Sequence, residues 1–109
     1  MKLLRILFVL TLLSAAGCRS HVIHLTVINT SSQPVSTIIV DYPDATFGVN
    51  SLAPGHSFPY FIKPMATGAL KVQFVNAQGV SHSASGPTLH KGDEGVIQIK
   101  LSQDSAAFF

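Results

Sequence analysis

The sequence predicts an all-β fold, a sandwich of six or seven strands that follows an N-terminal signal peptide. Turn residues recur roughly every eight to twelve positions, the spacing typical of sandwiches and barrels. The intervals between them are rich in β-branched residues and alternate with period two, and no window beyond residue 17 has useful helical periodicity. A chain of 109 residues allows one domain.

Residues 1–17 carry the features of a secretory signal. Lys2 and Arg5 form a basic start, residues 6–13 are apolar apart from Thr11, and small residues follow at positions 14–17. The apolar stretch is too short to cross a bilayer core, which needs about 20 residues. We therefore expect residues 1–17 to be removed on export.

The residues at the end of this segment are Ala15, Ala16, Gly17 and Cys18. They resemble the lipobox of bacterial lipoproteins, with Ala15 where leucine is usual. The resemblance implies cleavage before Cys18, acylation of its sulfur, and the lipid bilayer as a partner. It also implies a location in the bacterial cell envelope, at the outer membrane in a Gram-negative host, because Arg19 rather than Asp follows the cysteine. The alternatives are an ordinary secreted form with Cys18 as a free thiol and an uncleaved anchor.

Cleavage would leave a chain with no net charge. Five basic residues then face five acidic ones: Arg19, Lys63, Lys71, Lys91 and Lys100 against Asp41, Asp44, Asp93, Glu94 and Asp104. The pI near 8.9 of the full sequence therefore belongs mostly to the signal segment. A neutral domain has no field that would attract nucleic acid, so no nucleic-acid partner is expected.

The mature chain divides into an acylated cysteine with a short tether at residues 18–21, a sandwich domain over 22–104 and a tail over 105–109. The first half predicts strands over 22–29, 35–42 and 46–49, the last of them short, and then over 57–63. Pro59 lies inside the fourth segment and predicts that it is an edge strand. The sequence Ala53-Pro54-Gly55-His56 before it favours a type II turn.

The second half predicts strands over 69–76 and 80–85, joined by a short hairpin loop at 77–79. A longer loop over 86–95 then leads to the last strand, in which Ile97, Ile99 and Leu101 alternate with polar residues. This succession resembles an immunoglobulin-like or transthyretin-like sandwich, without the Cys–Trp–Cys core of antibody domains. The expected inward-facing residues are Ile23, Leu25, Val27, Ile38, Val40, Phe47, Leu52, Phe58, Tyr60, Ile62, Leu70, Val72, Phe74, Ile97, Ile99 and Leu101.

Motifs for enzyme chemistry or phosphate binding do not occur in the sequence, so we expect no enzyme activity and no cofactor. Four weak groupings remain. His21 and His24 are poorly placed to share a metal, because their odd spacing puts the two rings on opposite faces of a strand. Imidazole and carboxylate groups of His56, His82, His90 and Asp93 could hold zinc or copper. Asp41, Asp44 and Asn50 could contact calcium, without the order of an EF-hand. Ser81, Ser83 and Ser85 lie beside His82, which alone does not make a catalytic triad.

The function expected is therefore that of a membrane-anchored envelope lipoprotein acting as a non-enzymatic binding or assembly module. Its partner would be another envelope protein of open identity; the alternative is a metal-binding envelope protein that uses the His and Asp residues above. The edge strand with Pro59 offers one binding surface. The other is an outward apolar set, made of Val22, Ile28, Ile39, Val75 and Val96 and extended by Tyr42, Met65, Phe108 and Phe109.

Overall fold

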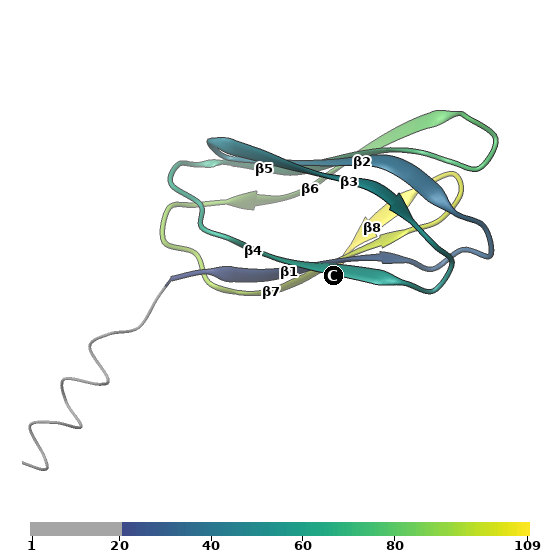
Figure 1. Ribbon diagram of the computed structural model, residues 1–109. Helices are drawn as coiled ribbons and strands as arrows, with labels where there is room; N and C mark the ends of the chain where they lie inside the picture. The colour runs from purple at the N-terminus through teal and green to yellow at the C-terminus, as the bar shows by residue number, and fades with distance from the viewer. Residues whose placement is uncertain (1–20) are drawn as a thin grey trace, which may run out of the picture.

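A computed structural model describes residues 21–109 as two packed β-sheets without a helix. Figure 1 shows the two layers, which form the predicted sandwich. The strands are β1 (Ile23–Asn29), β2 (Val35–Tyr42), β3 (Ala45–Leu52), β4 (Ser57–Ile62), β5 (Gly68–Val75), β6 (Ser81–Leu89), β7 (Gly95–Leu101) and β8 (Ala106–Phe108). No helix in this part of the chain could span a membrane.

The strand order sets the type of sandwich. One sheet, here called sheet A, has the order β4-β1-β7-β8, and the other, sheet B, has the order β3-β2-β5-β6. In an immunoglobulin constant-type domain the first strand pairs with the second in one sheet. Here β1 forms an antiparallel pair with β4 and a parallel pair with β7. Of the two expected types, this order excludes the immunoglobulin arrangement and leaves the transthyretin-like one.

The sandwich has two ends. The entry end is where β1 begins, together with the turn after β2, the connection after β4 (residues 63–67) and the loop after β6 (residues 90–94). The distal end carries the loop after β1 and the turns after β3, β5 and β7. In Figure 1 the entry end is on the left and the distal end on the right.

The core follows the alternation of the strands, because successive side chains of a strand point to opposite faces. In β1 the buried residues Ile23, Leu25 and Val27 are exposed by 2% or less. Thirteen of the sixteen residues expected in the core are buried, and the buried set adds Val35 and Leu89.

Three members of the expected core are not buried. Phe58 and Ile97 are half-buried, and Tyr60 is 37% exposed. Phe58 and Tyr60 lie on β4, which the structure confirms as an edge strand. The ring of Tyr60 stacks on Phe47 of β3 with centroids 4.0 Å apart, so it covers the side of the sandwich rather than its interior.

The second half of the chain contains more strand than predicted. Residues 86–89, expected in a loop, continue β6, whose edge position tolerates Pro87. The pairing with β5 shifts register between Ala69 and Lys71, opposite this segment. Residues 106–108, expected in a tail, form β8 and bring the number of strands to eight. The third strand is also longer than 46–49.

Asn29 is the one polar side chain buried completely among the described residues. Its Nδ2 donates to the carbonyl oxygens of Gln33 and Leu52 at 2.8 and 3.0 Å. Its Oδ1 accepts the backbone N–H of Ser31 at 3.0 Å. The side chain thereby joins the loop after β1 to the end of β3, and burial without a partner would cost free energy.

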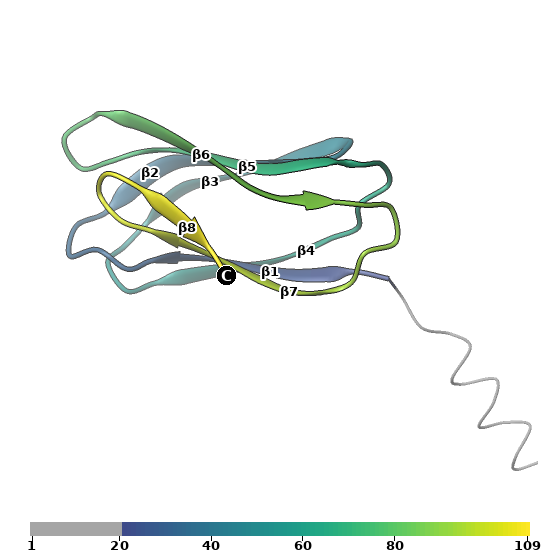
Figure 2. The ribbon, with the colours of Figure 1, turned by 180° about the vertical axis from the view of Figure 1, so that it is seen from behind.

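The two long sides of the sandwich are closed differently. On one side the aromatic rings of β3 and β4 meet, as described for Phe47 and Tyr60. On the other side β8 lies between β6 and β7, as Figure 2 shows. The Phe108 ring covers Gly86 of β6 so closely that a Cβ there would lie 2.5 Å from it. Since β8 is short, it closes only the distal part of this side.

Candidate functional site

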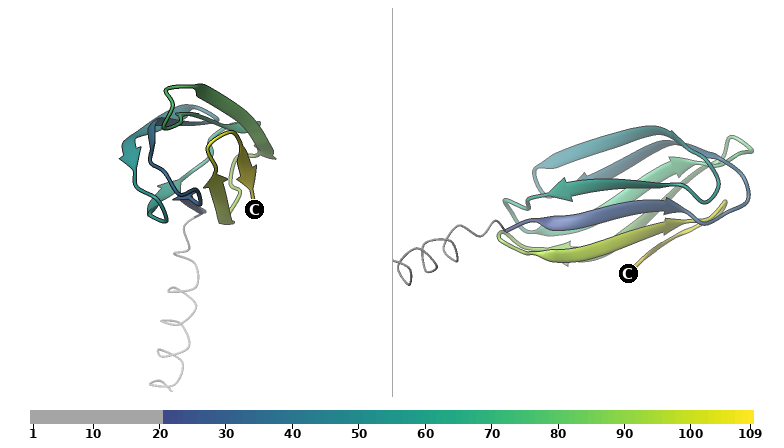
Figure 3. Two further views of the ribbon diagram at one scale, coloured as in Figure 1. Left: turned by 90° about the vertical axis from the view of Figure 1, so that its right-hand side faces the viewer. Right: turned by 60° about the horizontal axis from the view of Figure 1, so that its bottom comes forward.

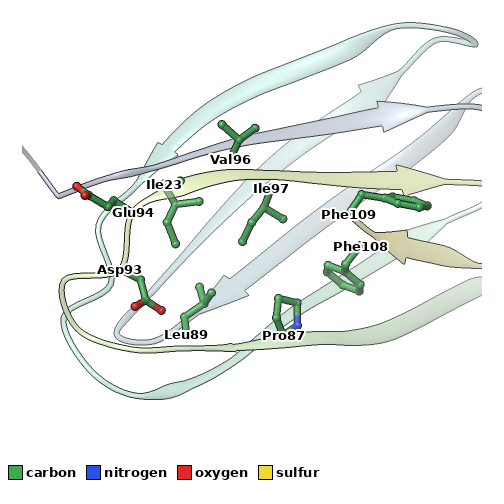
Figure 4. A pocket seen from close by; sticks show the side chains of 10 residues that line it. Ile23, Pro87, Leu89, Asp93, Glu94, Val96, Ile97, Phe108 and Phe109 are labelled. Carbon is green, nitrogen blue, oxygen red and sulfur yellow. The ribbon is translucent and has the colours of Figure 1, made fainter.

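A cleft of about 480 Å³ lies at the entry end, on the side that β8 leaves open. Its inner surface is apolar and comes from four strands, with Ile23, Pro87, Leu89, Ile97 and Phe108 as lining residues. Figure 4 shows Ile23, Leu89 and Ile97 directed into the space between β6 and β7. Such a mainly apolar concavity is the usual form of a binding site.

One wall of the cleft is a strand with an uncovered edge. The last contact between the C-terminal segment and β7 is a pair of 2.9 Å hydrogen bonds between the backbones of Gln98 and Phe109. Closer to the entry end, no strand among residues 21–109 pairs with β7 on this side. Figure 3 shows β8 as the short outer strand of sheet A.

The backbone N–H and C=O groups of successive residues in a strand point to alternate sides, which identifies the residue whose groups face the open edge of β7. The N–H of Gly95 points toward β1, where it donates to the carbonyl of Val22 at 3.4 Å. Gln98 points to the opposite side. Since direction alternates along a strand, Val96 presents its N–H and C=O to the open edge. The edge therefore offers one donor and one acceptor beside the apolar cleft.

Acidic side chains lie at the entry end of the cleft. The carboxylate of Asp93 accepts the backbone N–H of His90 at 2.8 Å, which organises the loop after β6. Glu94 lies 3.2 Å from Nδ1 of His21. Both pairs are largely exposed, so they contribute little to stability, but they place carboxylates beside the mouth of the cleft.

The predicted metal ligands are not brought together. His90 and Asp93 lie at the entry end, with Nδ1 of His90 3.6 Å from Oδ2 of Asp93. His56 lies in the turn after β3 and His82 near the start of β6, both toward the distal end. Over residues 21–109 no three His, Cys, Asp or Glu side chains form a group able to hold a metal ion. The first pair and the second pair therefore lie at opposite ends of the sandwich.

The side chains of the serine and acidic groupings are exposed or contact other groups. His82 packs on Phe74, with ring centroids 5.6 Å apart, whereas Ser81 and Ser83 are exposed on the alternate positions of β6. Asp41 accepts a hydrogen bond from Thr46 across the turn after β2. Cys18, the expected acylation site, lies outside the described residues.

Sequence reasoning missed the cleft because it assigned two of its walls to irregular segments. Pro87 and Leu89 fell in the expected loop, and Phe108 fell in the expected tail. The sequence has no period-two signal for β8, because Ala106-Ala107 and Phe108-Phe109 each repeat one residue type, and three residues are too few to predict a strand.

The burial of one tyrosine has an electrostatic consequence. Tyr42, at the end of β2, is half-buried near Phe47, with ring centroids 6.5 Å apart. Burial, with a smaller contribution from the charge of Tyr60, raises the pKa of Tyr42 above its usual 10.0. This group lies apart from the cleft, so the shift bears on stability rather than on binding.

No protein-family model and no curated protein matches the sequence. A solved structure is similar to it: an NMR structure of a protein from Eubacterium rectale, with a TM-score of 0.60 and 20% sequence identity. The alignment covers 82% of this chain and 87% of that one. At this identity the similarity supports the β-sandwich fold alone.

Proposed function

We propose that this chain is a lipid-anchored lipoprotein of the bacterial envelope that binds an extended segment of another envelope protein, without catalysis. The anchor would be acylated Cys18, and in a Gram-negative host the membrane would be the outer one. The binding site would be the cleft beside the uncovered edge of β7.

The observation that carries the binding proposal is the way β8 occupies the same groove. This strand pairs with β7 in the order Ile99↔Phe108, and its Phe108 ring fills the space above Gly86. A further strand in line with β8 would meet the free N–H and C=O of Val96. Its inward side chain would enter the cleft between Leu89 and Ile97. Addition of a strand to an open edge is a common mode of peptide recognition.

The chemistry of the cleft describes the segment that would fit. Backbone hydrogen bonds to β7 require an extended conformation, and the apolar lining requires an apolar side chain at the inward position. Carboxylates at the entry end favour a basic residue at the end of the segment that reaches Asp93.

Photo-crosslinking in native membranes tests the binding site. A photoreactive amino acid at Pro87, an exposed cleft residue, should give a crosslinked envelope protein that mass spectrometry identifies. The same amino acid at Val80, 50% exposed at the distal end, is the matched control. The crosslink should disappear with Ile97→Asp, which adds a charge to the cleft; Val80→Asp should leave it intact. Equal crosslinking from both positions would contradict the proposal.

A further inference from the structure

An apolar row crosses the outer face of sheet A at the entry end. His24 of β1 lies opposite Phe61 of β4 and Val96 of β7. Because Ile23 and Leu25 point into the core, His24 and its cross-strand neighbours point outward. Phe61 is 65% exposed and Val96 is 72% exposed. The ring of Phe61 packs against that of His24, with centroids 4.7 Å apart and planes at 85°.

Across β4, β1 and β7 this apolar character is confined to the entry end. One step along the same face, the corresponding row on these strands consists of Thr26, Pro59 and Gln98. Phe109, which is 66% exposed, pairs with Gln98 at the outer end of that row. The next row contains Ser57 and Lys100 beside half-buried Ile28, as the same pairing places them. Met65, in the connection after β4, adds another side chain at the entry end that is 51% exposed.

The face carries no carboxylate of its own. None of β1, β4 and β7 contains an Asp or Glu residue. Glu94 precedes β7 and lies 3.2 Å from His21. A face of this composition can approach an anionic lipid surface without like-charge repulsion from its own strands.

The position of the row relative to Cys18 decides between possible occupants. His24 is six positions after Cys18 in sequence, so the chain between them spans at most about 20 Å. β1 begins at the entry end. If Cys18 is acylated, its sulfur lies at the membrane surface, and the apolar row is the part of sheet A held nearest to it. Phe is among the side chains that form the apolar face of protein segments lying in the membrane interface.

We propose that the row of Phe61, His24 and Val96 rests on the phospholipid surface, so that sheet A faces the membrane at the entry end. This inference rests on the acylation of Cys18 that the proposed function includes. Phe61 would enter the headgroup region, and the cleft beside β7 would lie close to the membrane.

The chain contains no tryptophan, so single-tryptophan variants report on one site each. The acylated protein, with its lipid verified by intact mass, is reconstituted on vesicles of phosphatidylethanolamine and phosphatidylglycerol. Phe61→Trp should show a blue-shifted emission that lipids with brominated chains quench. Val80→Trp, at the distal end in the turn after β5, should stay unshifted and unquenched. Val96→Trp is a second reporter on another strand, should Phe61→Trp fail to fold.

The outcomes separate the two proposals. In one outcome the protein floats with the vesicles, but Phe61→Trp and Val96→Trp both emit as in water. The anchor proposal then stands, and the proposal that sheet A faces the membrane is overturned. A blue-shifted emission that the brominated lipids do not quench would instead indicate that the row binds a second copy of this chain, and it would overturn the proposal that sheet A faces the membrane as well. A mass for a bare Cys18, together with loss of flotation, overturns the anchor and the docking with it.

Discussion

Replacement of Gly86 by alanine should destabilise the sandwich through one contact. A Cβ at this position would lie 2.5 Å from Cδ2 of Phe108 and 2.7 Å from its Cγ and Cε2. Carbon atoms pack best about 3.5–4.0 Å apart, so the ring would have to move by about 1 Å. Overpacking of this kind costs about 1–3 kcal/mol. The φ angle of Gly86 is not positive, so alanine also lowers the entropy of the unfolded chain, which stabilises by about 0.4–1 kcal/mol.

The net loss expected for Gly86→Ala is about 1–2 kcal/mol, or roughly 4–16 °C in Tm for a domain of this size. Thermal and urea denaturation of the mature chain, followed by circular dichroism, measures it. Gly48→Ala is the matched control, because its Cβ would meet only the Ile38 carbonyl oxygen at 3.5 Å. In a Phe108→Ala background the same substitution should be neutral or stabilising. Equal costs for Gly86→Ala with and without the Phe108 ring would refute the reasoning.

Three further predictions concern other parts of the chain. Asn29→Ala should lower the free energy of unfolding by about 1–3 kcal/mol, because it leaves the buried carbonyl of Leu52 without its partner; urea denaturation at equal protein concentration measures the loss. The raised pKa of Tyr42 stabilises the fold fully below the unfolded value of 10.0, and this contribution is lost as the pH rises through the folded value. Tm should therefore fall less between pH 9 and 11 for Tyr42→Phe than for the parent, and parallel curves would contradict the assignment. Finally, the intact mass of protein extracted from native membranes should correspond to residues 18–109 with diacylglyceryl on Cys18, whereas a bare mature chain would indicate a secreted form.

Local patterns in the sequence were sufficient for the fold class and most of the core. Alternation in segments such as residues 23–27 arises from the pleat of a strand, which depends only on neighbouring residues. The edge position of β4 followed from Pro59, because a proline cannot donate in a central ladder. The prediction that Phe58 and Tyr60 are buried was wrong for a related reason. Both lie on an edge strand, which has no further strand beside it to cover its side chains.

The cleft and the apolar row depended on the tertiary structure. Val96 borders the cleft because β7 pairs with β1 and β8 covers only its distal part, and these pairings join residues far apart in the chain. His56 and His90 looked equally available to a metal in the sequence, yet the strand order places them at opposite ends. Local periodicity was therefore enough to assign the face of most side chains, but it was wrong for Phe108, which was expected to point outward and packs against the core. Only long-range pairing decided which faces meet, because strand partners are chosen by the packing of the whole sandwich rather than by local periodicity.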